Sequence, residues 1–276
     1  MKEYLKTRDF SVSGESFSLL HDENLDMLVT SPQPENLSSY YESEDYISHT
    51  DSSKSLTDKL YQWVKKVNLS SKWNLVQTFD DGSKTVLDIG AGTGDFLVYG
   101  NNLRFKVRGV EPNERARKLA TEKGVQLQSS LDELGNLKFR TITLWHVLEH
   151  LPNLQAQIKK TVSLLEEDGT LIVAVPNFKS YDAKHYKKFW AAYDVPRHLW
   201  HFSRISIAKL FEMENMRVVK TKPMLFDSFY VSMLSEKYKG GKLNLFKAFV
   251  IGLWSNIKAL STKEHSSLIY VIKRHN

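Results

Sequence analysis

The chain has 276 residues, no cysteine and a formal net charge of +6 at pH 7, with 41% hydrophobic and 25% charged residues. These values indicate a globular protein with one large α/β domain, or a core domain with a small attachment. The lack of cysteine excludes a disulfide framework, a thiolate metal site and a cysteine nucleophile. The charge is modest and no aromatic-interleaved basic stripe occurs, so we expect no nucleic-acid partner.

The N-terminal residues, 1–34, alternate loosely between apolar and polar side chains, which predicts short strands that end at Pro32 and Pro34. From about Ser55, apolar residues recur at three- and four-residue spacing and predict a helix. No apolar run suits a signal peptide or a transmembrane helix, so we expect a cytoplasmic protein. The segment between strands and helix is tyrosine-rich and could cover a cofactor with Tyr40, Tyr41, Tyr46 and His49.

Five short β-rich runs follow Thr85, with helix-like segments at 113–123 and 153–166 between them. The runs are TVLDIG, KVRGVEP, TITLWHV, GTLIVAVPN and SLIYVIKR. Strands that alternate with helices indicate a parallel sheet covered on both faces. The predicted fold class is therefore α/β, a doubly wound, mostly parallel Rossmann-like sheet with helices on both faces.

The sharpest local feature is a glycine turn, Asp88-Ile89-Gly90-Ala91-Gly92-Thr93-Gly94, between a buried strand and a helix that begins near Asp95. Glycines accept positive φ and let a ligand approach the backbone. A dinucleotide turn usually reads G-x-G-x-x-G, whereas the third glycine here comes one residue early. The preceding carboxylate would repel a diphosphate but suits a cationic ligand such as S-adenosylmethionine, which carries an ammonium and a sulfonium.

A second acid, Glu111, stands seventeen residues past Gly94, at the end of the second predicted strand. A carboxylate at this place can accept both hydroxyls of a ribose. Together with the glycine turn, it favours a nucleoside-containing ligand at the carboxyl ends of the strands.

With these residues, the chain resembles the class I S-adenosylmethionine-dependent methyltransferases from about Val86 to Asn177. The turn from Asp88 to Gly94 matches the family's first motif and Glu111 its second-strand acid. The run 144–151, LWHVLEHL, is similar to the fourth-strand signature of the ubiquinone-biosynthesis-type subgroup, and 169–177 looks like the fifth strand. The resemblance implies S-adenosylmethionine as cofactor and S-adenosylhomocysteine as product.

The resemblance also implies roles for individual residues. The Gly90–Gly94 backbone would face the methionine end of the cofactor, and Glu111 would hold its ribose. Ser130 and Leu131 would border the adenine, although the acid that many members carry there is displaced to Asp132. The implied cofactor-binding set is Asp88, Gly90, Ala91, Gly92, Gly94, Glu111, Pro112, Ser130, Leu131, Trp145 and His146.

A further resemblance covers Trp190–Ser203, which is similar to a stretch in bacterial methyltransferases often assigned to cell-surface sugar or lipid modification. The N-terminal piece is similar to a module that carries a cysteine-based zinc ribbon in relatives, and without those cysteines we expect no structural zinc. The implied organisation is an N-terminal module and cofactor cover at 1–50, then a methyltransferase domain at 51–276 with a lid or insert at about 178–262.

Several residues are candidates for acceptor chemistry. His146 has the best position for a catalytic role, whereas His150 more simply closes a turn. The spacing of His198 and His201 invites a metal, but no further ligands accompany them in the sequence, so we expect none. Arg197 could bind an acceptor carboxylate or phosphate, or pair with Asp194. The aromatic density suggests a lid over an apolar or ring-shaped acceptor, with core packing as the alternative for about half of the aromatic residues. The proposed substrate and lid residues are Trp190, Tyr193, Arg197, His198 and His201.

One apolar-rich segment, 243–260, places Phe246, Phe249, Val250, Leu253, Ile257 and Leu260 on one helical face. Core packing is the default interpretation, and a dimer contact or docking to a membrane surface are the alternatives. The oligomeric state stays open.

The function that these patterns favour is methyl transfer from S-adenosylmethionine to an oxygen or carbon of a small-molecule acceptor: a lipid, a quinone-like compound or a sugar. Two alternatives remain at this point. One is a catalytically silent domain that binds the cofactor or serves as a scaffold, and the other is a nicotinamide-dependent oxidoreductase.

Overall fold

The computed structural model describes residues 1–37, 40 and 56–275, so Tyr41, Tyr46 and His49 of the predicted cofactor cover lie outside it. The chain forms two compact units. The first contains Met1–Tyr41, His146–Ile158 and Val173–Asn276, and the second contains Glu42–Trp145 and Lys159–Ile172. The predicted division at residue 50 rests on family resemblance instead of contacts, and it stays a prediction.

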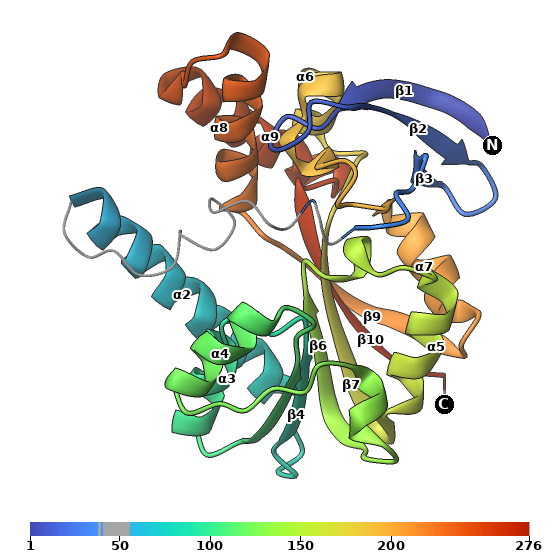
Figure 1. Ribbon diagram of the computed structural model, residues 1–276, viewed down its shortest axis with the longest axis vertical. Coiled ribbons are helices and arrows are strands. Elements are labelled where there is room, and N and C mark those ends of the chain that lie inside the picture. Colours follow the sequence, from blue (N-terminus) through green and yellow to red (C-terminus); the bar gives the residue numbers. More distant parts are fainter. Residues whose placement is uncertain (38–39, 41–55, 276) are drawn as a thin grey trace. The chain divides into compact units, whose positions relative to one another are not determined.

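Six strands hydrogen-bond in the order β5-β4-β6-β7-β10-β9 (Figure 1). They are β4 (Thr85–Ile89), β5 (Lys106–Val110), β6 (Phe139–Trp145), β7 (Leu165–Pro176), β9 (Met216–Pro223) and β10 (Ser267–Arg274). β4 pairs in parallel with both β5 and β6, whereas β10 and β9 are antiparallel. All five predicted strands are present, and the predicted Rossmann-like α/β class is confirmed.

The one strand of this sheet that the sequence analysis missed is β9, which lies at the sheet edge. Its sequence, MRVVKTKP, carries basic residues at 217, 220 and 222 and so lacks a clear apolar run. Charged side chains are common on edge strands because they discourage pairing with another chain. The missing apolar signal is therefore a consequence of the strand's place in the sheet.

The second unit holds the helices α2 (Leu56–Phe79), α3 (Asp95–Asn102) and α4 (Glu114–Glu122), as predicted. The helix α5 (Leu154–Ser163) ends three residues before its predicted boundary, since β7 already begins at Leu165. The indole of Trp73 on α2 stacks on Phe96 of α3 at 4.6 Å between ring centroids, and its Nε1 donates to the Phe96 carbonyl. A Cβ at Gly100 would lie 2.1 Å from that indole, so the glycine is required for α2 and α3 to pack.

The first unit contains a four-stranded sheet in the order β1-β2-β3-β8. Its strands are β1 (Lys2–Arg8), β2 (Ser16–Asp22), β3 (Met27–Ser31) and β8 (Trp200–His201), with antiparallel pairing throughout. The buried Asp9 carboxylate orders the turn after β1, because it accepts from the backbone N–H groups of Ser11, Val12 and Ser13. The strands predicted in 1–34 are thus present, and they pair with a segment nearly 170 residues later in the chain.

The core of the first unit joins the N-terminal strands to the predicted insert. It combines Phe17, Leu19 and Leu28 with the segment 178–195 and with Val231. The insert itself contains α6 (Tyr181–Tyr186), α7 (Arg204–Glu212), α8 (Asp227–Gly240) and α9 (Leu245–Thr262), with short 3-10 turns at Lys187–Phe189 and Ala191–Tyr193. The insert is thus an ordered part of this unit's core.

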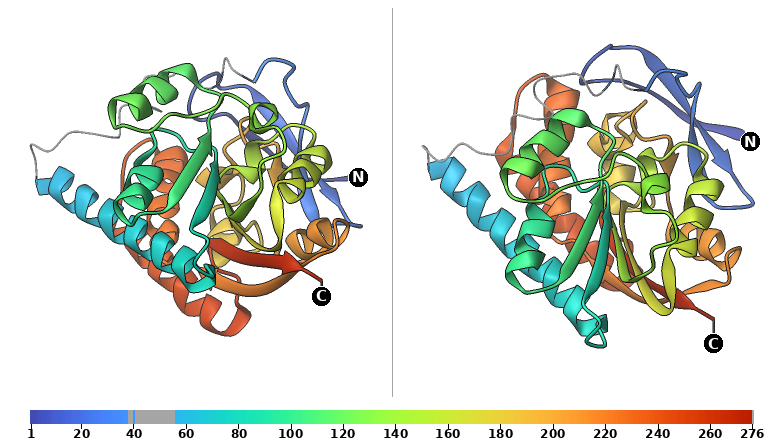
Figure 2. Two further views of the ribbon diagram at one scale, coloured as in Figure 1. Left: turned by 90° about the horizontal axis from the view of Figure 1, so that it is seen from below. Right: turned by 60° about the horizontal axis from the view of Figure 1, so that its bottom comes forward.

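The helix predicted within 243–260 is present as α9, which lies beside α8 (Figure 2). Its small residues are the buried ones: Ala248, Gly252, Ser255 and Ala259. The large apolar residues point outward, and Phe246 is 80% exposed and Leu260 69% exposed. The default expectation that this apolar face packs into the core is therefore wrong. Among the described residues, no helix has the length and apolar character needed to cross a membrane.

Candidate functional site

The glycine turn lies at the carboxyl end of β4, where the sequence predicts a ligand site. Gly90, Gly92 and Gly94 have φ values of 72°, 54° and 77°, in the left-handed region that disfavours other residues. A Cβ on Gly94 would lie 3.0 Å from the Ala120 side chain, whereas nothing lies within 4 Å of a Cβ on Gly92. Gly94 is therefore constrained by packing, and Gly92 faces open space that a ligand can enter.

The Glu111 side chain lies directly against this turn. Its Oε2 accepts from the Gly92 backbone N–H at 2.9 Å, and its Oε1 accepts from the Asn113 N–H at 2.9 Å. Arg117 fixes the same strand end, since its Nη1 donates to the carbonyls of Glu111 and Pro112. The two sequence motifs thus form one structure at the carboxyl ends of β4 and β5.

Asp88 is buried beneath the turn, and its Oδ1 accepts from the Thr143 hydroxyl at 2.6 Å. Burial raises the pKa of Asp88 to about 7; Thr143 and the Lys72 charge lower this pKa, and the Glu111 charge raises it further. A nearby cation would favour the carboxylate over the neutral acid. The role of Asp88 toward a cationic ligand stays a prediction.

Two further side chains of this region were missed by the sequence analysis. The Lys72 ammonium lies 4.5 Å from the centre of the Trp145 ring, and the same ring meets Phe96 edge-on. The Trp145 Nε1 is buried without a hydrogen-bond partner. Of the two missed side chains, Lys72 lies within the predicted helix, and nothing in the neighbouring sequence points to a role near the turn. Thr143 is a polar residue in a mostly apolar strand and could have been noticed.

The segment predicted to border the adenine is attached to the same strand end. The Glu111 N–H donates to the Gln128 carbonyl at 2.9 Å, and Gln128 forms an isolated parallel bridge with Val110. Ser130 is exposed and Leu131 is buried, so their contact with an adenine stays a prediction.

In the first unit, His146 lies between two carboxylates. Its Nδ1 is 3.3 Å from Glu149 Oε1 and its Nε2 is 3.1 Å from Asp227 Oδ2. Burial lowers the pKa of His146, but the hydrogen bonds and charges of Asp227 and Glu149 outweigh it and raise this pKa to about 10. In this arrangement His146 is an imidazolium, which can donate a proton or a hydrogen bond but cannot act as a general base.

The neighbouring histidines also have defined partners. His150 Nδ1 lies 3.0 Å from the Arg197 carbonyl, and His198 Nδ1 lies 2.9 Å from the Ala192 carbonyl. Glu149, His150 and His198 bring one ligand atom each to within 4.8 Å of one another. The expectation that no other ligand-type residue accompanies His198 is therefore wrong, because the fold supplies partners from 50 residues earlier. The predicted absence of a metal stays a prediction.

Arg197 and His201 have structural partners. The Arg197 guanidinium is buried and pairs with Asp194 through Nε and Nη2, which is the alternative to acceptor binding that the sequence left open. His201 Nε2 lies 3.0 Å from the Thr30 hydroxyl, which in turn donates to the His198 carbonyl. Burial and the His198 charge lower the pKa of His201 well below its usual value, so this ring is neutral.

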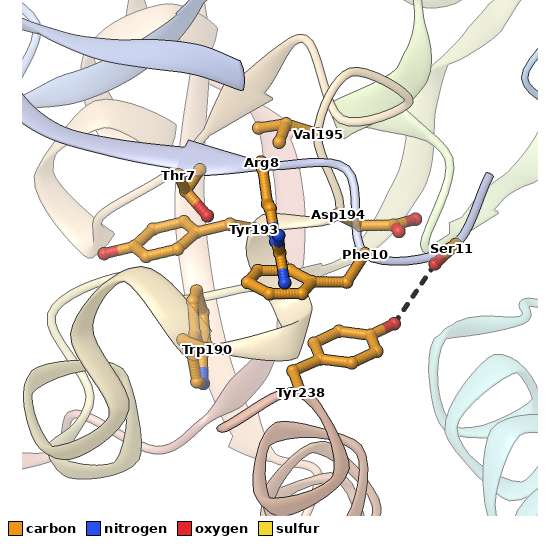
Figure 3. A pocket seen from close by; sticks show the side chains of 9 residues that line it. All are labelled: Thr7, Arg8, Phe10, Ser11, Trp190, Tyr193, Asp194, Val195 and Tyr238. Carbon is orange, nitrogen blue, oxygen red and sulfur yellow. Dashed lines mark hydrogen bonds between the residues drawn. The ribbon is translucent and has the colours of Figure 1, made fainter. Parts of the chain in front are cut away.

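Trp190 and Tyr193 lie in the core, each 2% exposed, and meet edge-on at 4.9 Å (Figure 3). The hollow beside them has a volume of about 10 Å³, room for roughly one water molecule. It is lined by Thr7, Arg8, Phe10, Ser11, Trp190, Tyr193, Asp194, Val195 and Tyr238. The expectation that Trp190 and Tyr193 form an open lid is therefore corrected: their burial leaves no ring surface to cover an acceptor.

Comparison with known proteins decides the family. A model described as "Methyltransferase domain" matches residues 58–221, more than half of the chain. The chain belongs to this methyltransferase family. The predicted membership in the class I S-adenosylmethionine-dependent methyltransferases is confirmed, and the oxidoreductase alternative finds no support.

Individual relatives are more distant. A ubiquinone biosynthesis O-methyltransferase from Haemophilus ducreyi is 30% identical over 122 residues, which is 38% of this chain. The match spans 52% of that relative, about half of its length.

Solved structures show the shared fold. The magnesium protoporphyrin IX methyltransferase of Synechocystis PCC 6803 with bound SAH has a TM-score of 0.56 at 18% identity, covering 86% of this chain and 97% of that one. A SAM-dependent methyltransferase from Archaeoglobus fulgidus has a TM-score of 0.52 at 18% identity, covering 76% and 94%.

Proposed function

We propose that this protein transfers a methyl group from S-adenosylmethionine to an oxygen or carbon of a small-molecule acceptor. The observation that carries the proposal is the contact between Glu111 and the Gly92 N–H, which joins an acid and an open glycine turn at adjacent strand ends. When bound, the cofactor supplies an activated methyl group for in-line displacement at carbon. The protein contributes orientation and the exclusion of water.

The residues of the second unit suit this cofactor. In the proposal, Glu111 exchanges its bond to Gly92 for the ribose hydroxyls, and Gly92 leaves room for the ligand to approach. The Asp88 carboxylate would balance the ligand's cationic end, and the Trp145 Nε1 would gain the partner that it lacks. The Asp88 carboxylate just before the turn disfavours a diphosphate and therefore a dinucleotide, whereas Glu111 would suit the ribose of either ligand.

The acceptor class is inferred from chemistry and from the relatives' names. The curated relative is a ubiquinone biosynthesis O-methyltransferase, which favours an oxygen acceptor on a quinone-like ring. A lipid or a sugar hydroxyl would be methylated in the same way, with the methyl group supplied by the cofactor and the hydroxyl proton passing to solvent. As an imidazolium whose two ring nitrogens face Glu149 and Asp227, His146 would not take that proton.

Calorimetric titration with S-adenosylhomocysteine tests the proposal. We expect micromolar binding to the unmodified chain and at least tenfold weaker binding to Glu111→Ala, a loss of about 1.4 kcal/mol. Glu114→Ala is the matched control, because Glu114 is exposed on α4, three residues further on, and pairs with Lys118 at the surface. Gly92→Ala should also weaken binding, since its Cβ would occupy the open space above the turn.

The outcomes distinguish an active methyltransferase from a catalytically silent scaffold domain. Equal binding by wild type and Glu111→Ala would contradict the assigned ribose contact. No detectable binding to wild type would overturn the enzyme reading and favour the scaffold alternative.

A further inference from the structure

The helix α9 has its small residues inward. Ala248, Gly252, Ser255 and Ala259 are buried at spacings of four, three and four residues, which is one face of a helix. A Cβ on Gly252 would lie 2.9 Å from the Phe229 Cα, so α8 and α9 meet at backbone distance there. The Ser255 hydroxyl donates to the buried Asp182 carboxylate at 2.7 Å. The helix is thus held firmly by the face that carries little apolar surface.

The opposite face of α9 is large, apolar and exposed. Exposed residues of this kind extend from the α8–α9 connection to the last turn: Leu243, Leu245, Phe246, Phe249, Val250, Leu253, Trp254, Ile257 and Leu260. We call this set the α9 face. Single exposed apolar side chains are ordinary, but a contiguous patch of this kind marks a binding surface.

Lysines outnumber acids around the α9 face, where Lys247 pairs with Glu236 of α8 at 3.2 Å and Glu264 follows the helix. From Leu243 to Lys263 the sequence contains no aspartate or glutamate, and lysines occur at 242, 247, 258 and 263. Lys258 also lies 5.2 Å from the Trp254 ring centre. Aromatic and aliphatic residues flanked by lysines are typical of helices that lie in a membrane interface.

A basic pocket of about 440 Å³ opens in the same unit. Four of its lining residues are lysines, Lys6, Lys187, Lys188 and Lys239, and the others are Leu5, His185, Tyr186 and Phe189. Burial lowers the pKa of His185, and so do the charges of Lys239 on α8 and Lys247 on α9, whereas Glu236 and Asp182 raise it. Four lysines line the pocket and no acid does, which suits an anionic group with an apolar body.

We propose that the α9 face docks on an anionic lipid surface, and that the lysine pocket receives the phosphate of a lipid headgroup. A second copy of the chain fits these observations less well. A twofold contact through the α9 face would bring the same lysines together without an acid on the helix to balance them. An anionic surface supplies the negative charge that the helix itself lacks.

Vesicle sedimentation tests this inference without any cofactor, so its outcome is independent of the proposed methyl transfer. We expect the full chain to bind vesicles of phosphatidylcholine mixed with phosphatidylglycerol, and to bind pure phosphatidylcholine about tenfold less well. Phe246→Glu with Leu260→Glu should abolish binding. The matched control is Ile205→Glu with Val219→Glu, which alters two exposed apolar residues on α7 and β9 and should bind like wild type.

The pocket has its own variant. Lys239→Glu should weaken binding to the mixed vesicles at least fivefold, whereas Lys220→Glu on β9, with the same charge change, should have a much smaller effect. Titration with inorganic phosphate covers the other source of the anion. Binding of free phosphate with no vesicle binding would overturn the docking proposal. So would a dimer in light scattering that Phe246→Glu with Leu260→Glu converts to a monomer, without vesicle binding by either form.

Discussion

The glycine turn and the surroundings of His146 differ in whether backbone or side-chain groups form them. Around the glycine turn, the backbone supplies much of the surface, and one carboxylate from the next strand, Glu111, completes it. Around His146, side chains supply nearly everything, and they come from segments as far apart as residues 146 and 227. The first region leaves space at Gly92, whereas the second is filled with ion pairs and buried rings.

This difference separates binding from stability. A backbone site can keep an open surface because its donors and acceptors are already satisfied within the turn. A cluster of buried side chains stabilises the fold only while every partner is in place, because a buried polar group without its partner costs free energy. We therefore expect substitutions in the second unit's turn to change ligand affinity, and substitutions of buried polar groups in the first unit to change stability.

The largest expected effect concerns Asp182, whose carboxylate is fully buried. It accepts from Trp190 Nε1 and from the hydroxyls of Ser255 and Ser266, each at 2.7 Å. Asp182→Ala leaves three buried donors without an acceptor, and we expect it to lower the free energy of unfolding by about 3–5 kcal/mol. Urea unfolding followed by tryptophan fluorescence measures this loss.

The control for that substitution is Asp132→Ala, which removes an exposed ion pair with Lys160. We expect it to cost less than about 1 kcal/mol. Similar losses for the two variants would break the contrast between the regions, because they would show that the Asp182 network contributes no more than a surface pair.

The next effect is a pH dependence of cofactor binding. Burial raises the pKa of Asp88 to about 7, so at pH 6 only about one tenth of it is ionised before the ligand binds. A cationic ligand favours the carboxylate, so affinity for S-adenosylhomocysteine should fall about tenfold from pH 8 to pH 6. Calorimetry at a series of pH values measures the slope, and Asp88→Asn should bind with a flat profile. A flat profile in wild type would show that Asp88 does not sense the ligand.

The last prediction concerns the protonation of His146. Its pKa of about 10 lies above that of an unfolded histidine, so its contribution to stability is complete below about pH 6.5 and is lost as the pH rises through about 10. Nuclear magnetic resonance of the imidazole should show a protonated ring at pH 8. Asp227→Asn removes one of the two carboxylates and should lower the pKa. A pKa of His146 near 6.5 in wild type would contradict the proposal that the two carboxylates keep this ring protonated.

The same contrast explains what the sequence could predict. The glycine turn and Glu111 are close in the chain and their chemistry is local, so their juxtaposition follows from strand order alone. The contact between His146 and Asp227 cannot be predicted from the residues near His146 in the sequence, because it depends on how α8 packs. The burial of Trp190 and Tyr193 was not predicted for the same reason, since a cluster of aromatic residues has the same sequence pattern in a lid and in a core. The orientation of α9 was misjudged because apolar periodicity identifies a face without saying whether it points inward.

The Asp182 network has a consequence for how α9 would meet a surface. Because the carboxylate holds Ser255 of α9, Ser266 before β10 and Trp190 together, the helix is ordered before it binds anything. Docking would then need no coupled folding and would lose little conformational entropy. We therefore expect amide hydrogen exchange in α9 to be slow already in the free protein, and adsorption to be governed by diffusion and charge instead of by a folding step.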